Sequence, residues 1–283
     1  MKPSDSQALS LDIFGSQTKY WVYNPTQQQT IFMLHGFRGN HQGLKYIIAG
    51  LSGYRIVVPD LPGFGESQPM TDRPHDIDGY SDFARQFMEL TGLTHPVLLG
   101  HSFGTIVAAH LAAREPELFS KLILINPIIV SPRTGAKGAV TKLVEAYYWL
   151  GTNTPDGFSQ WILGSRLFNR AMSLSLSRTS DPALRRLVYQ HHLDDLDQAQ
   201  HPRAIAESFA ASITKTALDD AARIHLETLL IAGEQDPIAP AGSQRQLHAA
   251  ISRSELILIP KVGHLVHLET PAAASDAISD FLG

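Results

Sequence analysis

Gly100-His101-Ser102-Phe103-Gly104 joins a short apolar run at residues 96–99 to an alanine-rich stretch at residues 103–114. The run has the composition of a buried strand, and the stretch has that of a helix. A serine between glycines at such a strand-to-helix turn exposes its hydroxyl group. Side chains in place of Gly100 and Gly104 would collide with neighbouring backbone, and the helix start puts positive potential beneath the serine. The segment therefore predicts a nucleophile, Ser102, in an α/β fold.

Short apolar runs and helical stretches alternate along much of the remaining chain. The predicted strands are residues 30–34, 55–59, 96–99, 122–125, 228–232 and 256–259, and the predicted helices are residues 42–51, 79–90, 103–114, 241–250 and 265–282. Nearly continuous Ile, Leu and Val runs are typical of parallel strands buried on both faces, and the alternation implies three layers. Residues 11–14 and 19–23 have the pattern of a hairpin, which would add antiparallel strands at one edge.

The composition excludes several classes of protein. The 283 residues are 43% hydrophobic and 18% charged, a globular balance with enough apolar residues for a sizeable core. The formal charge of −4 argues against a nucleic-acid-binding protein, and the absence of cysteine excludes disulfides and thiol nucleophiles. No apolar run approaches the roughly 20 residues of a membrane span. Residues 1–6 lack a signal-peptide pattern, so we expect a cytoplasmic location.

The alternation of predicted strands and helices stops between Asn126 and about Thr216. A structureless loop of that length is improbable in a compact domain, so we expect a helical insertion that folds over one end of the sheet. The predicted division is a core domain of residues 1–129 and 216–283 and a cap of residues 130–215. Trp149 and Trp161 are candidates to line a substrate pocket, while packing within the cap's own core is the alternative for its aromatic residues.

A serine nucleophile needs a base, and the base needs an orienting acid. His264 follows the predicted strand 256–259, and Asp236 follows the strand 228–232, so both are expected at the strand ends where sites of parallel sheets form. Glu234 is an alternative acid, and His267 is more consistent with packing, or with supporting the catalytic residues from behind, than with catalysis. Asn126 also ends a strand, but an amide cannot replace the carboxylate.

Acyl transfer also needs two fixed N–H donors for the oxyanion. The backbone N–H groups of Phe103, one residue past the serine, and of Phe37, just after the strand 30–34, are the candidates. His35 is expected to orient this loop by hydrogen bonding, and both His35 and His101 are candidate substrate-binding residues.

Taken together, these motifs resemble the alpha/beta-hydrolase family, in particular its lidded branch of esterases, carbon–carbon hydrolases, epoxide hydrolases and dehalogenases. The resemblance covers residues 18–282 and rests on the serine turn and on four further motifs. These are His35-Gly36-Phe37, Asp60-Leu61-Pro62-Gly63-Phe64-Gly65-Glu66-Ser67, Gly233-x-x-Asp236 and Gly263-His264.

The resemblance implies a three-layer, mostly parallel sheet with a helical cap after the sixth strand. It also implies a triad of Ser102, Asp236 and His264 and an oxyanion hole from the N–H groups of Phe37 and Phe103. We expect no cofactor.

Departures from the family pattern narrow the chemistry. A serine nucleophile, where dehalogenases and epoxide hydrolases use aspartate, sets those reactions aside. Leu265 stands where carbon–carbon hydrolases often carry tryptophan, which weakens that branch. Thr105 replaces a common second glycine inside the helix, and this change affects no catalytic residue.

One further cluster has the residue types of a metal site. The stretch His191-His192-Leu193-Asp194-Asp195-Leu196-Asp197 offers ligands at helical spacing, but we expect a solvated part of the cap and no metal.

The expected function is hydrolysis of a small to medium, uncharged carboxylic ester through an acyl-enzyme, with a hydrophobic small molecule as substrate. A meta-cleavage carbon–carbon hydrolase is the main alternative, and it would need a basic cap residue such as Arg166, Arg170 or Arg178 facing the pocket. A lyase, a cofactor-free oxygenase and a small-molecule sensor are further alternatives on the same fold. The sequence does not indicate an oligomeric state.

Overall fold

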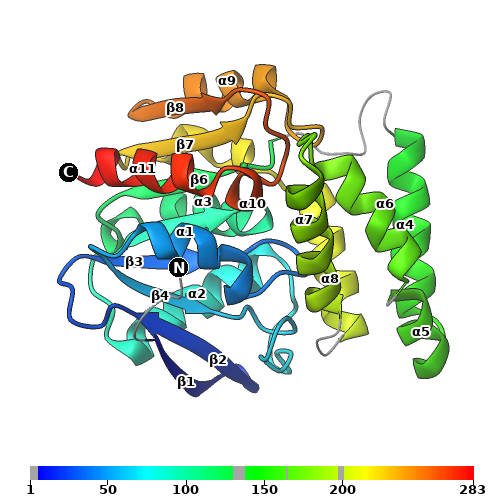
Figure 1. Ribbon diagram of the computed structural model, residues 1–283. Coiled ribbons are helices and arrows are strands. Elements are labelled where there is room, and N and C mark those ends of the chain that lie inside the picture. The colour runs from blue at the N-terminus through cyan, green and yellow to red at the C-terminus, as the bar shows by residue number, and fades with distance from the viewer. Residues whose placement is uncertain (1–5, 130–137, 164, 197–200) are drawn as a thin grey trace.

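One eight-stranded sheet forms the centre of the molecule, in the order β1-β2-β4-β3-β5-β6-β7-β8 (Figure 1). The structure is a computed structural model that describes residues 6–129, 138–163, 165–196 and 201–283. The strands are β1 (Ser6–Ile13), β2 (Ser16–Tyr23), β3 (Thr30–Leu34), β4 (Arg55–Pro59), β5 (Val97–His101), β6 (Leu122–Ile125), β7 (Thr228–Gly233) and β8 (Ser254–Ile259). β1 pairs antiparallel with β2 and β2 with β4, while every other pair is parallel, as the sequence predicts.

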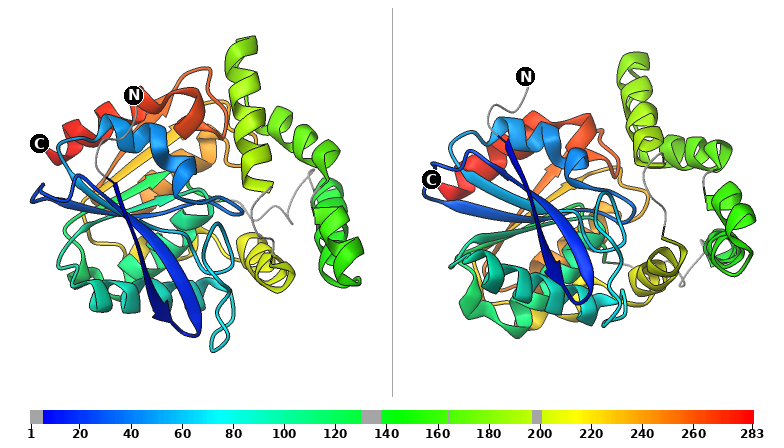
Figure 2. Two further views of the ribbon diagram at one scale, coloured as in Figure 1. Left: turned by 60° about the horizontal axis from the view of Figure 1, so that its bottom comes forward. Right: turned by 90° about the horizontal axis from the view of Figure 1, so that it is seen from below.

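Helices cover both faces of this sheet (Figure 2). α1 (Lys45–Gly50) and α11 (Pro271–Leu282) pack on one face, and α2 (Ile77–Thr91), α3 (Phe103–Arg114) and α9 (Ala241–Ala250) pack on the other. Alternate strand residues point to opposite layers. Thus Ile31 joins the core beneath α1 and α11, while Phe32 joins the core beneath α2 and α3, and both are fully buried. The three-layer prediction is confirmed.

Two predicted helices differ from the structure. The stretch 42–51 begins as a 3-10 turn at His41–Leu44 before α1. The stretch 265–282 is two helices, α10 (Val266–Glu269) and α11, because Pro271 begins the second. Proline has no N–H to donate, and its ring would clash with the preceding turn of a continuous helix. The break makes α10 a separate short element that begins two residues after His264.

Among the described residues between β6 and β7, five α-helices form an insertion. They are α4 (Gly138–Thr152), α5 (Asp156–Leu163), α6 (Arg166–Leu176), α7 (Pro182–Leu196) and α8 (Pro202–Thr214). Figures 1 and 2 show them together to one side of the sheet, with α7 and α8 nearest to it. The division at residues 129/130 and 215/216 stays a prediction, and residues 130–137 of the predicted cap lie outside the described residues.

No helix within the described ranges is long and apolar enough to cross a membrane.

Candidate active site

Ser102 lies in a strained turn between β5 and α3, with φ +51° and ψ −116°. A Cβ at Gly100 would lie 2.4 Å from the Gly104 carbonyl oxygen, and a Cβ at Gly104 would lie 2.3 Å from the Leu34 carbonyl oxygen. Both distances are shorter than van der Waals contact, so only glycine fits at these two positions. The Ser102 N–H donates to the Ile125 carbonyl oxygen of the adjacent strand at 2.9 Å, which helps to hold the turn.

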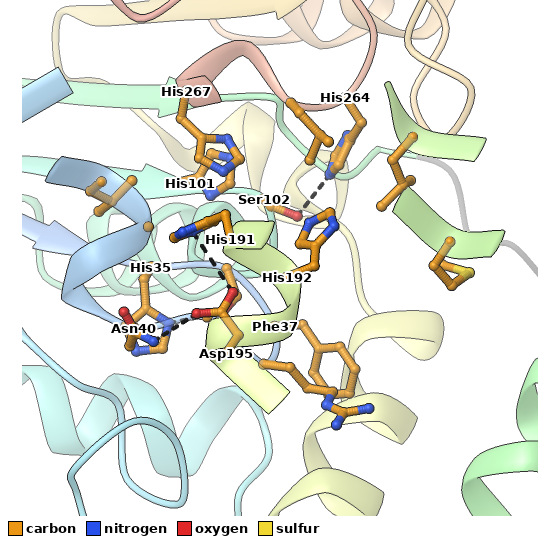
Figure 3. Close-up of a pocket in the computed structure, with 18 of the residues that line it drawn as sticks. His35, Phe37, Asn40, His101, Ser102, His191, His192, Asp195, His264 and His267 are labelled. Atoms are coloured by element: carbon orange, nitrogen blue, oxygen red, sulfur yellow. Dashed lines mark hydrogen bonds and ion pairs between the residues drawn. The ribbon is translucent and has the colours of Figure 1, made fainter. Parts of the chain in front are cut away.

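Three side chains from three loops form one hydrogen-bonded chain. The distance from Ser102 Oγ to His264 Nε2 is 2.9 Å, and that from His264 Nδ1 to Asp236 Oδ2 is 2.7 Å (Figure 3 shows the first). A carboxylate only accepts hydrogen bonds, so Nδ1 carries the imidazole proton and Nε2 is left to accept the serine hydroxyl. The structure therefore brings the predicted nucleophile, base and acid together, although they are distant in the sequence.

Asp236 is held as a carboxylate by several donors. Its Oδ1 accepts the N–H groups of Ile238 at 2.7 Å and Ala239 at 3.1 Å, and Asn126 Nδ2 donates to Oδ2 at 3.3 Å. Burial alone would raise the pKa of the Asp236 carboxyl, but His264 and the backbone N–H groups outweigh burial and lower it. Glu234, the alternative acid, is exposed to solvent and is not part of this chain of hydrogen bonds.

The loop after β3 lies against the serine turn. A Cβ at Gly36 would lie 3.3 Å from Ser102 Cβ, so the backbone here approaches Ser102 closely. The next residue, Phe37, contacts Phe103 edge-to-face with ring centroids 6.4 Å apart. Among the described residues, the N–H groups of Phe37 and Phe103 have no hydrogen-bond acceptor. Both amides are therefore available to a ligand beside Ser102.

His35 stabilises this loop. Its Nε2 accepts the Leu61 N–H at 2.8 Å, so its Nδ1 carries the proton and donates to the Gly36 carbonyl oxygen at 2.8 Å. Burial lowers the pKa of His35, which favours this neutral form. The ring borders the pocket, but both of its nitrogens are used to join the loops after β3 and β4.

A cavity of about 170 Å³ opens above Ser102 between the sheet and the inserted helices. Its apolar cap lining comes from Tyr148, Phe168, Met172 and Leu176. The predicted pocket residues Trp149 and Trp161 do not line it, because their side chains are 63% and 71% exposed on the outer helices. Helical periodicity alone could not show which face of α4 or α5 turns inward.

The polar stretch of α7 also lines this cavity, contrary to the expectation of a solvated segment. Asn40 Nδ2 donates to Asp195 Oδ1 at 2.8 Å, and this bond joins α7 to the loop after β3. Burial raises the pKa of Asp195 to about 7 and lowers those of His191 and His192 to about 4. In the part of the chain that the structure describes, no group of three or more His, Asp or Glu residues is arranged to hold a metal ion.

Two further histidines complete the lining. His101, a predicted candidate, borders the cavity, and His267 from α10 packs against it with ring centroids 4.1 Å apart. The sequence predicted that His267 packs in the core or supports the catalytic residues from behind, and not that it borders the pocket. Its spacing of three residues from His264, within one helical turn, was the available signal for a place in the pocket.

The fold and this arrangement define the class of the protein. Residues 29–271 match the family described as alpha/beta hydrolase fold, and the chain belongs to that family. The following similarities were found among known proteins.

An uncharacterized hydrolase of Bacillus subtilis is 24% identical over 95% of both chains. A 2-hydroxymuconate semialdehyde hydrolase of a Pseudomonas species is 26% identical, over 81% of this chain and 76% of its own. Among solved structures, a hydrolase from Pseudomonas aeruginosa has a TM-score of 0.78 at 21% identity, covering 99% of both chains. A thermophilic esterase from Thermogutta terrifontis has a TM-score of 0.76 at 20% identity, over 99% of this chain and 98% of its own. At these identities the two solved structures support the fold alone.

Proposed function

We propose that this hydrolase is a serine esterase that cleaves small, uncharged carboxylic esters through an acyl-enzyme. The hydrogen-bonded chain from Ser102 through His264 to Asp236, with distances of 2.9 and 2.7 Å, is the observation that carries the proposal. A serine hydroxyl is a weak nucleophile until a neutral base accepts its proton. The tautomer of His264 supports this role.

In the proposed reaction, Ser102 Oγ attacks the ester carbonyl carbon while His264 Nε2 takes the hydroxyl proton. The N–H groups of Phe37 and Phe103 stabilise the oxyanion of the tetrahedral intermediate. His264 then returns the proton to the departing alcohol, which leaves Ser102 acylated. A water molecule activated by the same imidazole releases the acid. Asp236 keeps the imidazole in the reactive orientation throughout.

The cavity supports the proposed size and charge of the substrate. Its volume of about 170 Å³ is below the usual range for drug-sized ligands, which is roughly 300–1,000 Å³. Phe37, Tyr148 and Phe168 provide apolar walls, and the low pKa values of His101 and His191 leave those rings uncharged at neutral pH. Short acyl esters therefore fit the cavity better than triglycerides or peptides.

Labelling with a fluorophosphonate, combined with ester hydrolysis, tests the proposal. We expect the wild-type protein to gain one adduct on Ser102, located by peptide mass spectrometry, and to hydrolyse phenyl butanoate. Ser102→Ala should take no adduct and should lose at least about 10,000-fold in kcat with an unchanged circular dichroism spectrum. Ser52→Ala, on an exposed serine, is the matched control and should behave as wild type. Equal hydrolysis by Ser102→Ala would contradict the proposal.

A carbon–carbon hydrolase is the second candidate. The similarity to a 2-hydroxymuconate semialdehyde hydrolase favours it, as does Arg38, which borders the cavity and could face an anionic substrate. Against it, the cap residues Arg166, Arg170 and Arg178 are exposed and are absent from the cavity lining. Turnover of a vinylogous diketone acid, with no turnover of uncharged esters, would favour this candidate over the esterase.

A further inference from the structure

Arg38 has a backbone conformation that is unusual for an arginine. Its φ is +54°, in the left-handed region that favours glycine. It is the third residue of a tight turn, which the Gly39 N–H closes by donating to the Gly36 carbonyl oxygen at 3.0 Å. Where such a turn needs a positive φ, glycine or asparagine is the usual residue. Contacts around Arg38 must therefore hold this conformation against its energetic cost.

The side chain of Arg38 makes one such contact, because it reaches the cap. Arg38 Nη2 donates to the Leu163 carbonyl oxygen at 3.0 Å. Leu163 is the last residue of α5 and is fully buried. Carbonyl groups in the last turn of a helix lack intrahelical donors, so a buried one needs a donor from elsewhere. The Tyr147 hydroxyl also donates to this oxygen, at the longer distance of 3.3 Å, so the arginine is the closer of these two donors.

The loop that contains this turn is held to the sheet on one side and to the cap on the other. His35 bonds to the loop after β4. The Phe37 ring packs on Tyr148 of α4, with centroids 5.5 Å apart. Asn40 donates to Asp195 of α7 at 2.8 Å (Figure 3). The Phe37 N–H therefore lies between an anchor to the sheet and several anchors to the cap.

We propose that Arg38 is a positioning residue, whose bond to the cap holds the turn so that the Phe37 N–H is aimed at the oxyanion. The inference rests on the proposed ester hydrolysis, in which this N–H is one of the two oxyanion donors. If the turn relaxed from its strained conformation, the peptide group of Phe37 would shift away from its place beside Ser102. A displacement of about 1 Å in a catalytic group can cost on the order of 100-fold in rate.

Two substitutions with opposite backbone preferences test the inference. Arg38→Met removes the donor but keeps a side chain that disfavours positive φ. Its kcat for phenyl butanoate should fall roughly ten- to hundredfold while KM stays within about twofold, because the lost interaction acts only in the transition state. Arg38→Gly also removes the donor, but glycine adopts a positive φ without strain, so this variant should recover most of the loss.

Two controls make the comparison specific. Counting kcat per Ser102 adduct, after complete labelling with a fluorophosphonate, cancels any loss of folded protein. His95→Met changes an exposed residue that also has a positive φ, +47°, in the loop before β5. This variant should keep the wild-type kcat, because its turn is not part of the cavity lining.

An inhibitor that forms an oxyanion reports on the donor directly. Ser102 Oγ adds to the carbonyl carbon of propyl trifluoromethyl ketone, His264 takes the hydroxyl proton, and the ketone oxygen becomes an oxyanion that mimics the tetrahedral intermediate. Arg38→Met should weaken this inhibitor by about the factor that it loses in kcat, and Arg38→Gly should restore most of the affinity. Propyl methyl ketone, which forms no such adduct, should bind all three proteins equally.

Each other outcome contradicts a stated part of the argument. An unchanged kcat in Arg38→Met, or equal losses in Arg38→Met and Arg38→Gly, would overturn the inference while ester hydrolysis stands. A higher KM for an anionic ester in both variants, with kcat for phenyl butanoate retained, would overturn it by assigning Arg38 to substrate binding. A wild-type protein that neither hydrolyses phenyl butanoate nor is inhibited by the trifluoromethyl ketone would overturn the proposed function, and the inference with it.

Discussion

The cavity has two walls that are held in different ways. On the sheet side, Ser102, Asp236 and His264 follow β5, β7 and β8, and the turn that holds Ser102 admits only glycine at positions 100 and 104. On the cap side, His191 and Asp195 lie on α7, which is joined to the sheet side by the Asn40–Asp195 hydrogen bond and by a small apolar cluster. The sheet wall depends on local backbone geometry, whereas the cap wall depends on how a helix docks.

This difference has a consequence for mutation. Changes in the sheet wall should abolish the reaction or the fold, because the atoms there have no room to adjust. Changes in the cap wall should alter pH dependence or substrate preference, because the helix contributes side chains around the substrate and not the attacking groups.

The largest expected effect is on the acid of the sheet wall. Asp236→Asn should lower kcat for phenyl butanoate by roughly 10,000-fold, because an amide in place of the carboxylate favours the wrong tautomer of His264. Glu234→Gln, two residues earlier and exposed, is the matched control and should change kcat less than twofold. If Glu234→Gln lost activity and Asp236→Asn kept it, the acid would be Glu234. Asp236 would then no longer support the view that the sheet wall holds the groups that react.

The next effect is on folding of the sheet wall. Gly104→Ala should lower the free energy of unfolding by about 3 kcal/mol or more, because the new Cβ would lie 2.3 Å from the Leu34 carbonyl oxygen and 2.7 Å from that of His35. Gly242→Ala in α9 has open space around it and should be neutral or stabilising by up to about 1 kcal/mol. Urea denaturation measures both. Similar stability of the two variants would show that the turn is not rigid.

The buried Asp195 of the cap wall should make the stability of the protein depend on pH. Burial raises the pKa of Asp195 to about 7, so between the ordinary aspartate pKa and 7 the folded protein holds a proton that the unfolded chain has lost. Stability therefore decreases as pH rises through this window, on the order of 1 kcal/mol per pH unit. Asp195→Asn should remove this decrease.

Melting temperatures at pH 5 and pH 8 measure the effect. The difference between them should be smaller in Asp195→Asn than in wild type. Asp194→Asn, at the exposed neighbouring position, should keep most of the wild-type difference, because burial raises the pKa of Asp195 more than the charge of Asp194 does. Identical differences in all three proteins would mean that Asp195 titrates normally and that the cap wall is more open to water than its burial indicates.

The smallest effects should distinguish the inner and outer aromatic residues of the cap. Phe168 borders the cavity and stacks on Tyr147 with centroids 3.7 Å apart, so Phe168→Ala should raise KM for phenyl butanoate about three- to tenfold. Trp161 lies at the exposed surface, where Phe158 is the only ring among the described residues that it stacks on. Trp161→Ala should therefore leave KM within twofold. A larger KM change in Trp161→Ala would indicate that the outer face of the cap also meets substrate.

Much of the sheet wall could be predicted from the sequence because its signals are local. The glycines around Ser102, the apolar strands and the loop positions of Asp236 and His264 each follow from backbone geometry over a few residues. Parallel strands then bring the ends of those loops to one edge of the sheet. The order of the elements and the three layers follow from the same short-range patterns.

The cap wall was decided only by tertiary structure. The rotation of each helix against its neighbours decides whether Trp161 faces solvent and whether His191 and Asp195 face the cavity. The sequence does not fix this rotation, because an aromatic or polar residue is tolerated on either face of a helix. The pairing of His101 with His267 likewise arises where segments distant in the chain pack together, whereas the break at Pro271 is a local effect of proline. The sequence by itself determined the sheet and predicted the triad residues that follow its strands, because their positions are set by the backbone. The tertiary structure determined what surrounds the substrate, because side-chain environments on a docked helix are set by packing.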